Sequence, residues 1–318
     1  MKKLIILISI LIASVISGVV WWENGKRPPD PTSEKSVIFV VKKGDGVREI
    51  ANNLKEKGLI RSRIIFFLLI KQFGLDKDIQ AGDFRLSPKM TTEEIALNLT
   101  HGTLDIWVTI PEGKRAEEIA EVLKKEIPTY NDSWQNILMI NEGYLFPDTY
   151  LIPKNADIEM VLNQLRGNFE QKYSTLNILN AKLNQKEIVI LASLIEREAI
   201  TDEEKPIIAG ILMNRLNAGM ALQVDATIQY AKGKNASNNK WWEPVTTEEY
   251  KSVLSNYNTY INIGLPPGPI SNPGLEALRA AANPSDTNYL YYLHDKNKTI
   301  RYARTLTEHN ENIKIFGL

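Results

Sequence analysis

The chain has 318 residues, which is long enough for two or three domains with a substantial core. Its 38 basic residues balance its 38 acidic residues, so the composition argues against a nucleic-acid-binding protein. The absence of cysteine excludes disulfides, thiolate metal sites and a cysteine nucleophile, and it suits an oxidising compartment. The three histidines show no metal-ligand spacing, so we expect neither a metal nor another cofactor.

The N-terminal residues predict a membrane anchor. Lys2 and Lys3 precede an uncharged run over residues 4–22, and about twenty apolar residues span a bilayer as a helix. The run is long for a cleaved signal peptide, so we expect residues 1–22 to remain as a single-pass transmembrane helix. The two lysines place the N-terminus in the cytoplasm and the rest of the chain outside it. Residues 23–36, rich in proline and charge, predict a linker.

An internal repeat follows the predicted linker. The segment VKKGDGVREIANNL at 41–54 matches IPEGKRAEEIAEVL at 110–123, with Gly44 aligned to Gly113. Each copy predicts a short strand, a glycine turn and an amphipathic helix. Between the copies we expect a helix over 61–73, a strand over 81–86 and a helix that begins with a capping box, Thr91 with Glu94.

The first copy of the repeat resembles the opening of a LysM module, a peptidoglycan-binding fold. It departs from that pattern at Gly46, where LysM sequences usually carry Ser or Thr as the helix N-cap. The resemblance implies a LysM-like module over residues 37–103. Residues 104–150 are then a second strand–helix unit with its connecting loop.

The C-terminal half has a different character. Helical patterns cover residues 158–173 and 186–197, and residues 289–293 and 300–303 predict a β-hairpin. We therefore expect a helix-rich domain over 151–318, and an α+β fold for the chain as a whole.

The stretch over residues 187–225 is the most informative. A nearly unbroken apolar run ends in the cluster Glu196-Arg197-Glu198. Charge at a helix end is usually solvated, so the cluster alone favours an ordinary exposed end. A carboxyl group buried at such an end is costly, but desolvation raises the pKa of a carboxylic acid and makes it a proton donor near neutral pH.

Several long motifs in fixed order carry a family resemblance: EGYLFPDTY, ILASLIERE, ILMNRLNAGMALQVDATIQY, YNTYINIGLPPGPISNPG, YLYYL and EHN. Together they resemble the endolytic murein transglycosylase family (YceG-like) over nearly the whole chain. Two positions depart from that pattern. Ala226 stands where the family has Pro or Ser, and Ile300, before Arg301, stands where it often has His.

The resemblance implies a lyase of the bacterial cell membrane that acts on peptidoglycan. Such an enzyme cleaves glycan strands internally, between N-acetylmuramic acid and N-acetylglucosamine, and leaves 1,6-anhydro ends. It also implies partners among the peptidoglycan synthases and other cell-wall elongation or division proteins.

The same resemblance assigns catalysis to the first glutamate of the triplet, Glu196, with Glu198 as the alternative. Ordinary glycosidases use two carboxylates, but helical residues two apart point roughly 200° apart and cannot form such a pair. A lytic transglycosylase needs only one. We expect Glu196, kept protonated by apolar neighbours such as Ala192 and Ile195, to protonate the glycosidic oxygen. As a carboxylate it then takes the proton of the muramic acid 6-hydroxyl as that oxygen attacks C1.

Polar residues on the same helix, the next helix and two aromatic loops are candidates for binding the glycan, although each could instead be structural: Ser193, Glu142, Asn214, Gln223, Asp225, Tyr257, Asn258 and Tyr260. One alternative function is a muramidase-type hydrolase, with Asp225 or Glu142 as second carboxylate. Another is a non-catalytic peptidoglycan-binding scaffold. A triad of Ser193, His309 and Asp225 is disfavoured, because no G-x-S-x-G elbow surrounds any serine.

Overall fold

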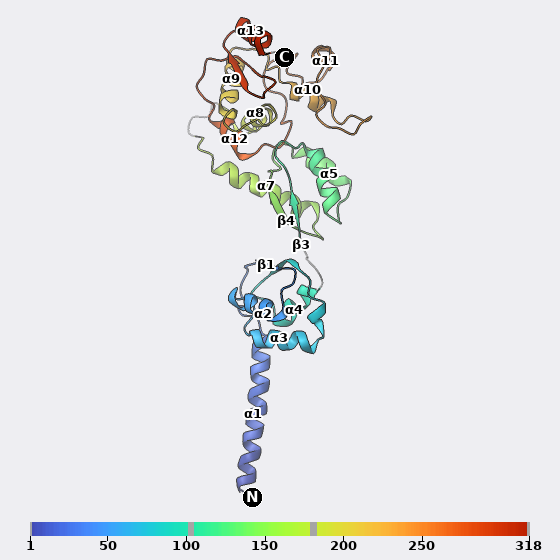
Figure 1. Cartoon of the computed structure of the whole chain (residues 1–318), viewed down its shortest axis with the longest axis vertical. Coiled ribbons are helices and arrows are strands. Elements are labelled where there is room, and N and C mark those ends of the chain that lie inside the picture. Colours follow the sequence, from blue (N-terminus) through green and yellow to red (C-terminus); the bar gives the residue numbers. More distant parts are fainter. Residues whose placement is uncertain (1, 101–104, 179–182, 317–318) are drawn as a thin grey trace. The chain divides into compact units, whose positions relative to one another are not determined.

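The computed structural model describes residues 2–100, 105–178 and 183–316 of the chain. These residues form two compact units, and the second consists of residues 108–150 and 156–318 (Figure 1). Both units combine helices with short strands that pair two by two. The predicted α+β class is therefore confirmed.

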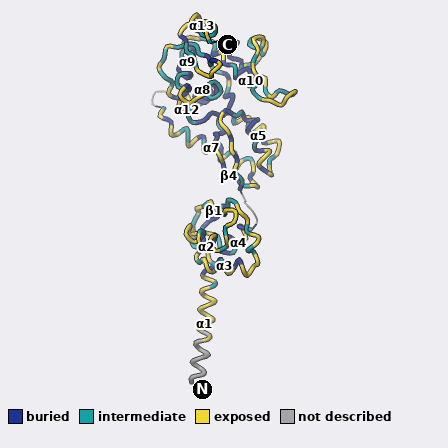
Figure 2. Tube along the Cα trace, in the orientation of Figure 1, coloured by how far each residue is buried: buried dark blue, intermediate teal, exposed yellow. Residues whose placement is uncertain are grey.

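The first unit begins with helix α1, Lys2–Lys26. Between residues 13 and 21 the helix is exposed, whereas Gly25 is buried and its carbonyl accepts a hydrogen bond from Thr92 Oγ1 at 3.1 Å (Figure 2). Nowhere in the described part of the chain is a helix both long enough and apolar enough to cross a membrane. The transmembrane helix predicted for residues 1–22 is thus not confirmed.

The segment expected to be a linker is attached to the first unit by hydrogen bonds. Arg61 Nε donates to the Pro28 carbonyl at 2.8 Å, and Ser87 Oγ donates to the Lys35 carbonyl at 2.8 Å. These contacts hold residues 27–36 along the unit instead of leaving them as a free spacer.

The remainder of the first unit has the order β–α–α–β–α. Its elements are β1 (Val37–Val41), α2 (Val47–Glu56), α3 (Arg63–Gln72), the 3-10 helix η1 (Leu75–Lys77), β2 (Gly82–Leu86) and α4 (Thr92–Thr100). β1 and β2 pair antiparallel with Phe39 opposite Phe84, and both rings are buried in the core of the unit. The predicted capping box of α4 is present, because Glu94 N donates to Thr91 Oγ1 and Thr91 N donates to Glu94 Oε2.

The second copy of the sequence repeat begins directly after strand β3 (Asp105–Thr109), which pairs with β4 (Thr149–Pro153), and continues into α5 (Ala116–Glu126). Gly44 and Gly113 both take the positive φ that the aligned glycine turns require, +99° and +71°. Residues 108–150 belong to the same compact unit as the C-terminal part, although the sequence suggested a separate unit for them.

The rest of the second unit consists of eight further helices and a hairpin within the described residues: α6 (Ser133–Ile140), α7 (Ile158–Ser174), α8 (Gln185–Glu198), α9 (Lys205–Asn217), α10 (Asp225–Lys232), α11 (Glu249–Ser252), α12 (Leu275–Ala282), β5 (Tyr291–His294), β6 (Ile300–Ala303) and α13 (Leu306–Phe316). β5 and β6 pair antiparallel, with Tyr292 opposite Tyr302. This confirms the predicted C-terminal hairpin.

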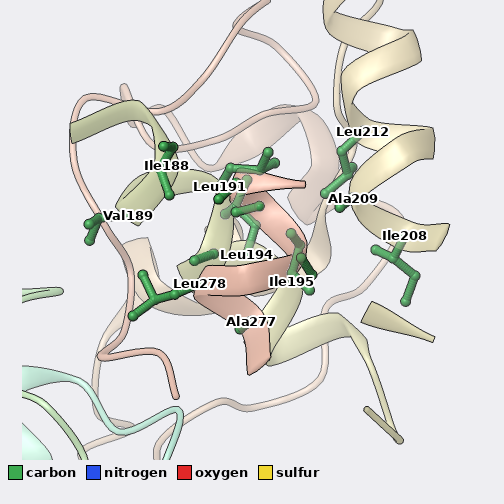
Figure 3. Packing of buried hydrophobic residues seen from close by; sticks show 14 of the residues in the cluster. Ile188, Val189, Leu191, Leu194, Ile195, Ile208, Ala209, Leu212, Ala277 and Leu278 are labelled. Carbon is green, nitrogen blue, oxygen red and sulfur yellow. The ribbon is translucent and has the colours of Figure 1, made fainter. Parts of the chain in front are cut away.

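Helix α8 forms the centre of the second unit. All eight residues from Ile188 to Ile195 are buried, so the helix is enclosed on every side between its first and last turns. Its apolar side chains pack against α9 through Ala209 and Leu212 and against α12 through Ala277 and Leu278 (Figure 3). Ser193 fastens α8 to the loop before α12, because its hydroxyl accepts a hydrogen bond from Ile270 N at 3.0 Å.

We expect Gly143→Ala to destabilise the protein by about 2–4 kcal/mol. Gly143 has φ +86°, and an added Cβ would lie 2.4 Å from Pro269 Cγ and 2.8 Å from Val189 Cγ1 in the core. The matched control is Gly167→Ala in α7, where an added Cβ meets nothing within 4 Å and helix propensity should improve. Urea unfolding measures both changes, and equal midpoints for the two variants would contradict the packing at Gly143.

Candidate active site

The two glutamates in the last turn of α8, Glu196 and Glu198, lie in different surroundings. Glu198 lines an open cavity of about 460 Å³, and Glu196 does not. This agrees with the angular separation expected of helical residues two apart. The cavity is lined by residues from α8, α9, α10, β5, α13 and two loops: Arg197, Glu198, Arg215, Gln223, Asp225, Ala226, Gln229, Tyr260, Tyr291, Tyr292, Leu306 and His309.

Glu198 is held in the cavity by a tyrosine of the hairpin. Tyr292 Oη donates to Glu198 Oε2 at 2.8 Å. Burial raises the pKa of Glu198, the hydrogen bond from Tyr292 lowers it, and the charge of Asp225 raises it again, so the net shift is upward. A carboxyl group in this state keeps its proton to a higher pH than an exposed one, and it can serve as an acid.

Asp225 and Gln223 bring the segment QVDAT, residues 223–227, to the same cavity. Asp225 is the first residue of α10, and its Oδ1 accepts a hydrogen bond from Tyr260 Oη. Tyr260 in turn stacks on Tyr250, with ring centroids 4.1 Å apart. Gln223 is exposed and has φ +50°, a conformation that residues other than glycine adopt uncommonly.

Glu196 has partners on the other side of α8. Its Oε2 accepts a hydrogen bond from Gly274 N at 3.1 Å, just before α12, and lies 3.5 Å from Lys205 Nζ. Lys205 also pairs with Asp202 at 2.8 Å. Burial lowers the pKa of Lys205, but the bond to Asp202 and the charge of Glu196 raise it above its usual range. The sequence predicted only apolar neighbours for Glu196, and the buried lysine was missed.

Glu112 lies close to Glu196 and was also missed by the sequence analysis. An added Cβ on Gly274 would overlap the Glu112 carboxyl group, so Glu112 is in direct contact with Gly274. Partial burial and the charge of Glu196 raise the pKa of Glu112. The only sequence signal is the position of Glu112 just before the aligned turn glycine of the second repeat.

Three predicted glycan-binding residues bond to the protein itself; Ser193 and Asn258 are buried and Asn214 is half-buried. Ser193 donates to the Ile190 carbonyl at 2.7 Å. Asn214 donates to the carbonyls of Thr287 and Tyr289, at 2.7 and 3.0 Å. Asn258, fully buried, donates to the carbonyls of Tyr250 and Val253. These side chains satisfy backbone groups that would otherwise be unpaired, and none lines the cavity around Glu198.

Two further candidates lie away from the cavity as well. Glu142 is buried, where Ala116 N donates to its carboxylate at 3.0 Å and Asn272 Nδ2 donates to Oε1 at 2.8 Å. Burial raises the pKa of Glu142 to about 8, against the lowering effect of the Ala116 N–H. Tyr257 packs on Tyr230, with ring centroids 4.8 Å apart.

The cavity also contains residues that the sequence analysis did not select. Tyr291 and Tyr292 come from the motif YLYYL and His309 from EHN, so the family resemblance could have identified them. Arg215 is fixed by its Nε, which donates to the Leu290 carbonyl at 2.6 Å. Arg301, which follows the position of the family's usual His, instead pairs with Asp295 at 2.9 Å.

The arrangement brings two carboxyl groups, Glu198 and Asp225, into one cavity lined by tyrosines. The YceG-like family matches residues 39–315, so the chain belongs to the YceG-like family. It is 31% identical over 319 residues to the endolytic murein transglycosylase of Bacillus subtilis (strain 168), an alignment that covers 90% of this chain and 86% of that protein.

A second relative and a solved structure agree with this assignment. The endolytic murein transglycosylase of Streptococcus pneumoniae serotype 2 (strain D39) is 28% identical over 354 residues, and the alignment covers 97% of this chain. It covers 63% of that relative, so the chain spans less than two thirds of the relative's length. A solved structure of a YceG-like protein from Listeria monocytogenes superposes with a TM-score of 0.57 at 27% identity, over 88% of this chain and 99% of that one.

We expect the stability of the protein to fall with rising pH because of Glu142. Its folded pKa of about 8 lies above the ordinary 4.5, so between these values the folded state binds a proton that the unfolded state has released. The contribution of this proton to the free energy of unfolding is fully present below about pH 4.5 and is lost as the pH rises through about 8. Urea unfolding at a series of pH values should therefore show a smaller fall for Glu142→Gln than for the wild type. The same fall in both proteins would contradict this.

Proposed function

We propose that this protein is an endolytic murein transglycosylase. It cleaves the bond between N-acetylmuramic acid and N-acetylglucosamine within peptidoglycan strands and forms 1,6-anhydro ends. Membership of the YceG-like family and the names of the two curated relatives support the activity. The cavity supports it independently, because it is lined by aromatic, amide and carboxyl groups, which suit a hydroxyl-rich ligand.

The observation that carries the mechanism is the position of Glu198. Its carboxyl group lines the cavity, bonds to Tyr292 and has a raised pKa, whereas Glu196 is occupied by Gly274 N and Lys205. We therefore propose Glu198 as the general acid/base. The family resemblance suggested Glu196 as the acid, with Glu198 as the alternative. The geometry of the cavity favours Glu198.

In the proposed reaction, protonated Glu198 gives its proton to the glycosidic oxygen as the bond to C1 breaks. The resulting carboxylate then accepts the proton of the 6-hydroxyl while that oxygen forms the new bond to C1. The acid is regenerated, and no water enters the reaction. Holding the 6-hydroxyl close to C1 supplies the nucleophile at a high effective concentration.

A hydrolytic muramidase is the second candidate, and the presence of Asp225 in the same cavity favours it. Two carboxyl groups around one cavity are what an ordinary glycosidase requires. Asp225, however, already accepts a hydrogen bond from the hydroxyl of Tyr260. That hydrogen bond competes with the one that Asp225 would make to an activated water. A non-catalytic scaffold has less support, because a binding role needs no buried carboxyl group with a raised pKa.

We also propose that the protein acts outside the cytoplasm, where peptidoglycan lies. The β–α–α–β order of the first unit and its Lys42–Asp45 turn are compatible with a LysM-like module that holds the glycan. Attachment to the cell membrane through the N-terminal segment and contacts with peptidoglycan synthases remain predictions. Fractionation of cells that produce the full chain tests the first of them.

We expect Glu198→Gln to lower the initial rate of glycan cleavage by at least about 100-fold, because the amide cannot donate the proton. Glu196→Gln should lower it by less than about tenfold, since that residue positions α12 and does not line the cavity. The measurement is release of soluble fragments from purified peptidoglycan, with thermal melts to verify folding. The opposite ranking of two folded variants would assign the acid to Glu196, and full activity in both would contradict a role for the triplet.

The pH dependence of cleavage should also report on Glu198. The acid must be protonated, so the rate should fall as the pH rises through the raised pKa of Glu198. The hydrogen bond from Tyr292 lowers this pKa, and its removal in Tyr292→Phe should shift the fall in rate to higher pH. Rate profiles of both proteins over the same buffers test this, and a shift to lower pH would exclude the proposed contact as the cause.

A further inference from the structure

Arg197, between the two glutamates, has no role in the proposed reaction although it lines the cavity. Its Nε is buried and, among the described residues, has no hydrogen-bond partner. Within the same residues, no carboxylate oxygen lies within 4.0 Å of the guanidinium as an ion-pair partner. A buried donor without a partner is costly in a folded protein, and a ligand can satisfy it.

The guanidinium is held in place by an aromatic ring. Its Cζ lies 4.0 Å from the ring centroid of Trp242, and Trp242 Nε1 donates to Glu118 Oε2 at 2.8 Å. Trp242 has φ +58°, which is unfavourable for a bulky side chain. Strain of this kind persists where surrounding contacts impose it, and it concentrates at functional sites.

The carboxylates near Arg197 are committed to other partners. Glu118 pairs with Lys114 at 2.6 Å, Glu196 with Lys205 at 3.5 Å, and Glu198 bonds to Tyr292. Burial lowers the pKa of Arg197, and the charges of the three glutamates only partly oppose this effect. Because an arginine stays charged even so, the cavity contains a desolvated cation that has no close ion-pair partner among the described residues.

We propose that Arg197 binds a carboxylate of the substituent on muramic acid and thereby selects the glycan that enters the cavity. This inference rests on the proposed function. The carboxylate belongs either to the peptide stem or, where the stem has been removed, to the lactyl group itself. An arginine matches a carboxylate with two parallel N–H···O bonds, which a neutral amide cannot reproduce with equal strength. Trp242 acts as a positioning residue for the guanidinium.

The test compares three peptidoglycan substrates: strands with intact stems, strands whose stem carboxylates have been converted to amides, and strands whose stems have been removed. The wild type, Arg197→Gln, Arg197→Lys and Trp242→Phe are assayed for kcat/KM on each. Arg279→Gln is the matched control, because Arg279 lies exposed in α12, pairs with Glu276 and does not line the cavity. Thermal melts verify that each variant folds.

We expect the wild type and Arg279→Gln to prefer a carboxylate-bearing substrate over amidated strands by about tenfold. In Arg197→Gln this ratio should fall to about one, and in Arg197→Lys and Trp242→Phe to an intermediate value. Preference for intact strands identifies the stem carboxylate, and preference for stem-free strands alone identifies the lactyl carboxylate.

An unchanged ratio in folded Arg197→Gln would overturn the proposal, as would a wild type that cleaves all three substrates equally. If Arg197→Gln does not fold, an unchanged ratio in Arg197→Lys and Trp242→Phe overturns it instead. A wild type that cleaves none of the substrates refutes the proposed function itself, so the two failures are distinguishable.

Discussion

The site depends on the burial of the central part of α8, residues 188–195. Because every residue from Ile188 to Ile195 is enclosed, the helix can neither rotate nor shift without opening the core, and the directions of its last side chains are fixed. Hydrogen bonds at Ser193 add to this constraint by joining α8 to Ile270 and Ser271. A rigid element of this kind is what an acid–base group needs, since small displacements of a catalytic group are costly in rate.

Segments that are distant in sequence form the rest of the cavity around the last turn of α8. Asp225 opens α10, Tyr260 comes from a loop, and Tyr292 comes from the C-terminal hairpin. Each polar group among them has a partner that orients it, such as the hydroxyl of Tyr292 on Glu198 and that of Tyr260 on Asp225. Arg197 differs because an aromatic ring orients it and its Nε has no hydrogen-bond partner in the described part of the chain, which is why we assign it to the substrate.

Local patterns predicted α2 to α5, α7, α8, the hairpin, the glycine turns of the repeat and the opposite directions of Glu196 and Glu198. They could not say which glutamate faces the cavity, because that depends on where distant loops place Asp225 and Tyr292. They also overestimated the polar candidates. Ser193, Asn214 and Asn258 have the residue types of a binding site, but the fold uses them to satisfy buried backbone groups, and no local signal separates these two uses.

In the proposed reaction one carboxyl group, Glu198, cleaves the glycan without water. The most direct measurement is digestion of purified peptidoglycan by the full chain in water enriched in heavy oxygen, followed by mass spectrometry of the new muramic acid ends. We expect 1,6-anhydro ends that contain no heavy oxygen. Reducing ends that have incorporated heavy oxygen would contradict it and identify a hydrolase.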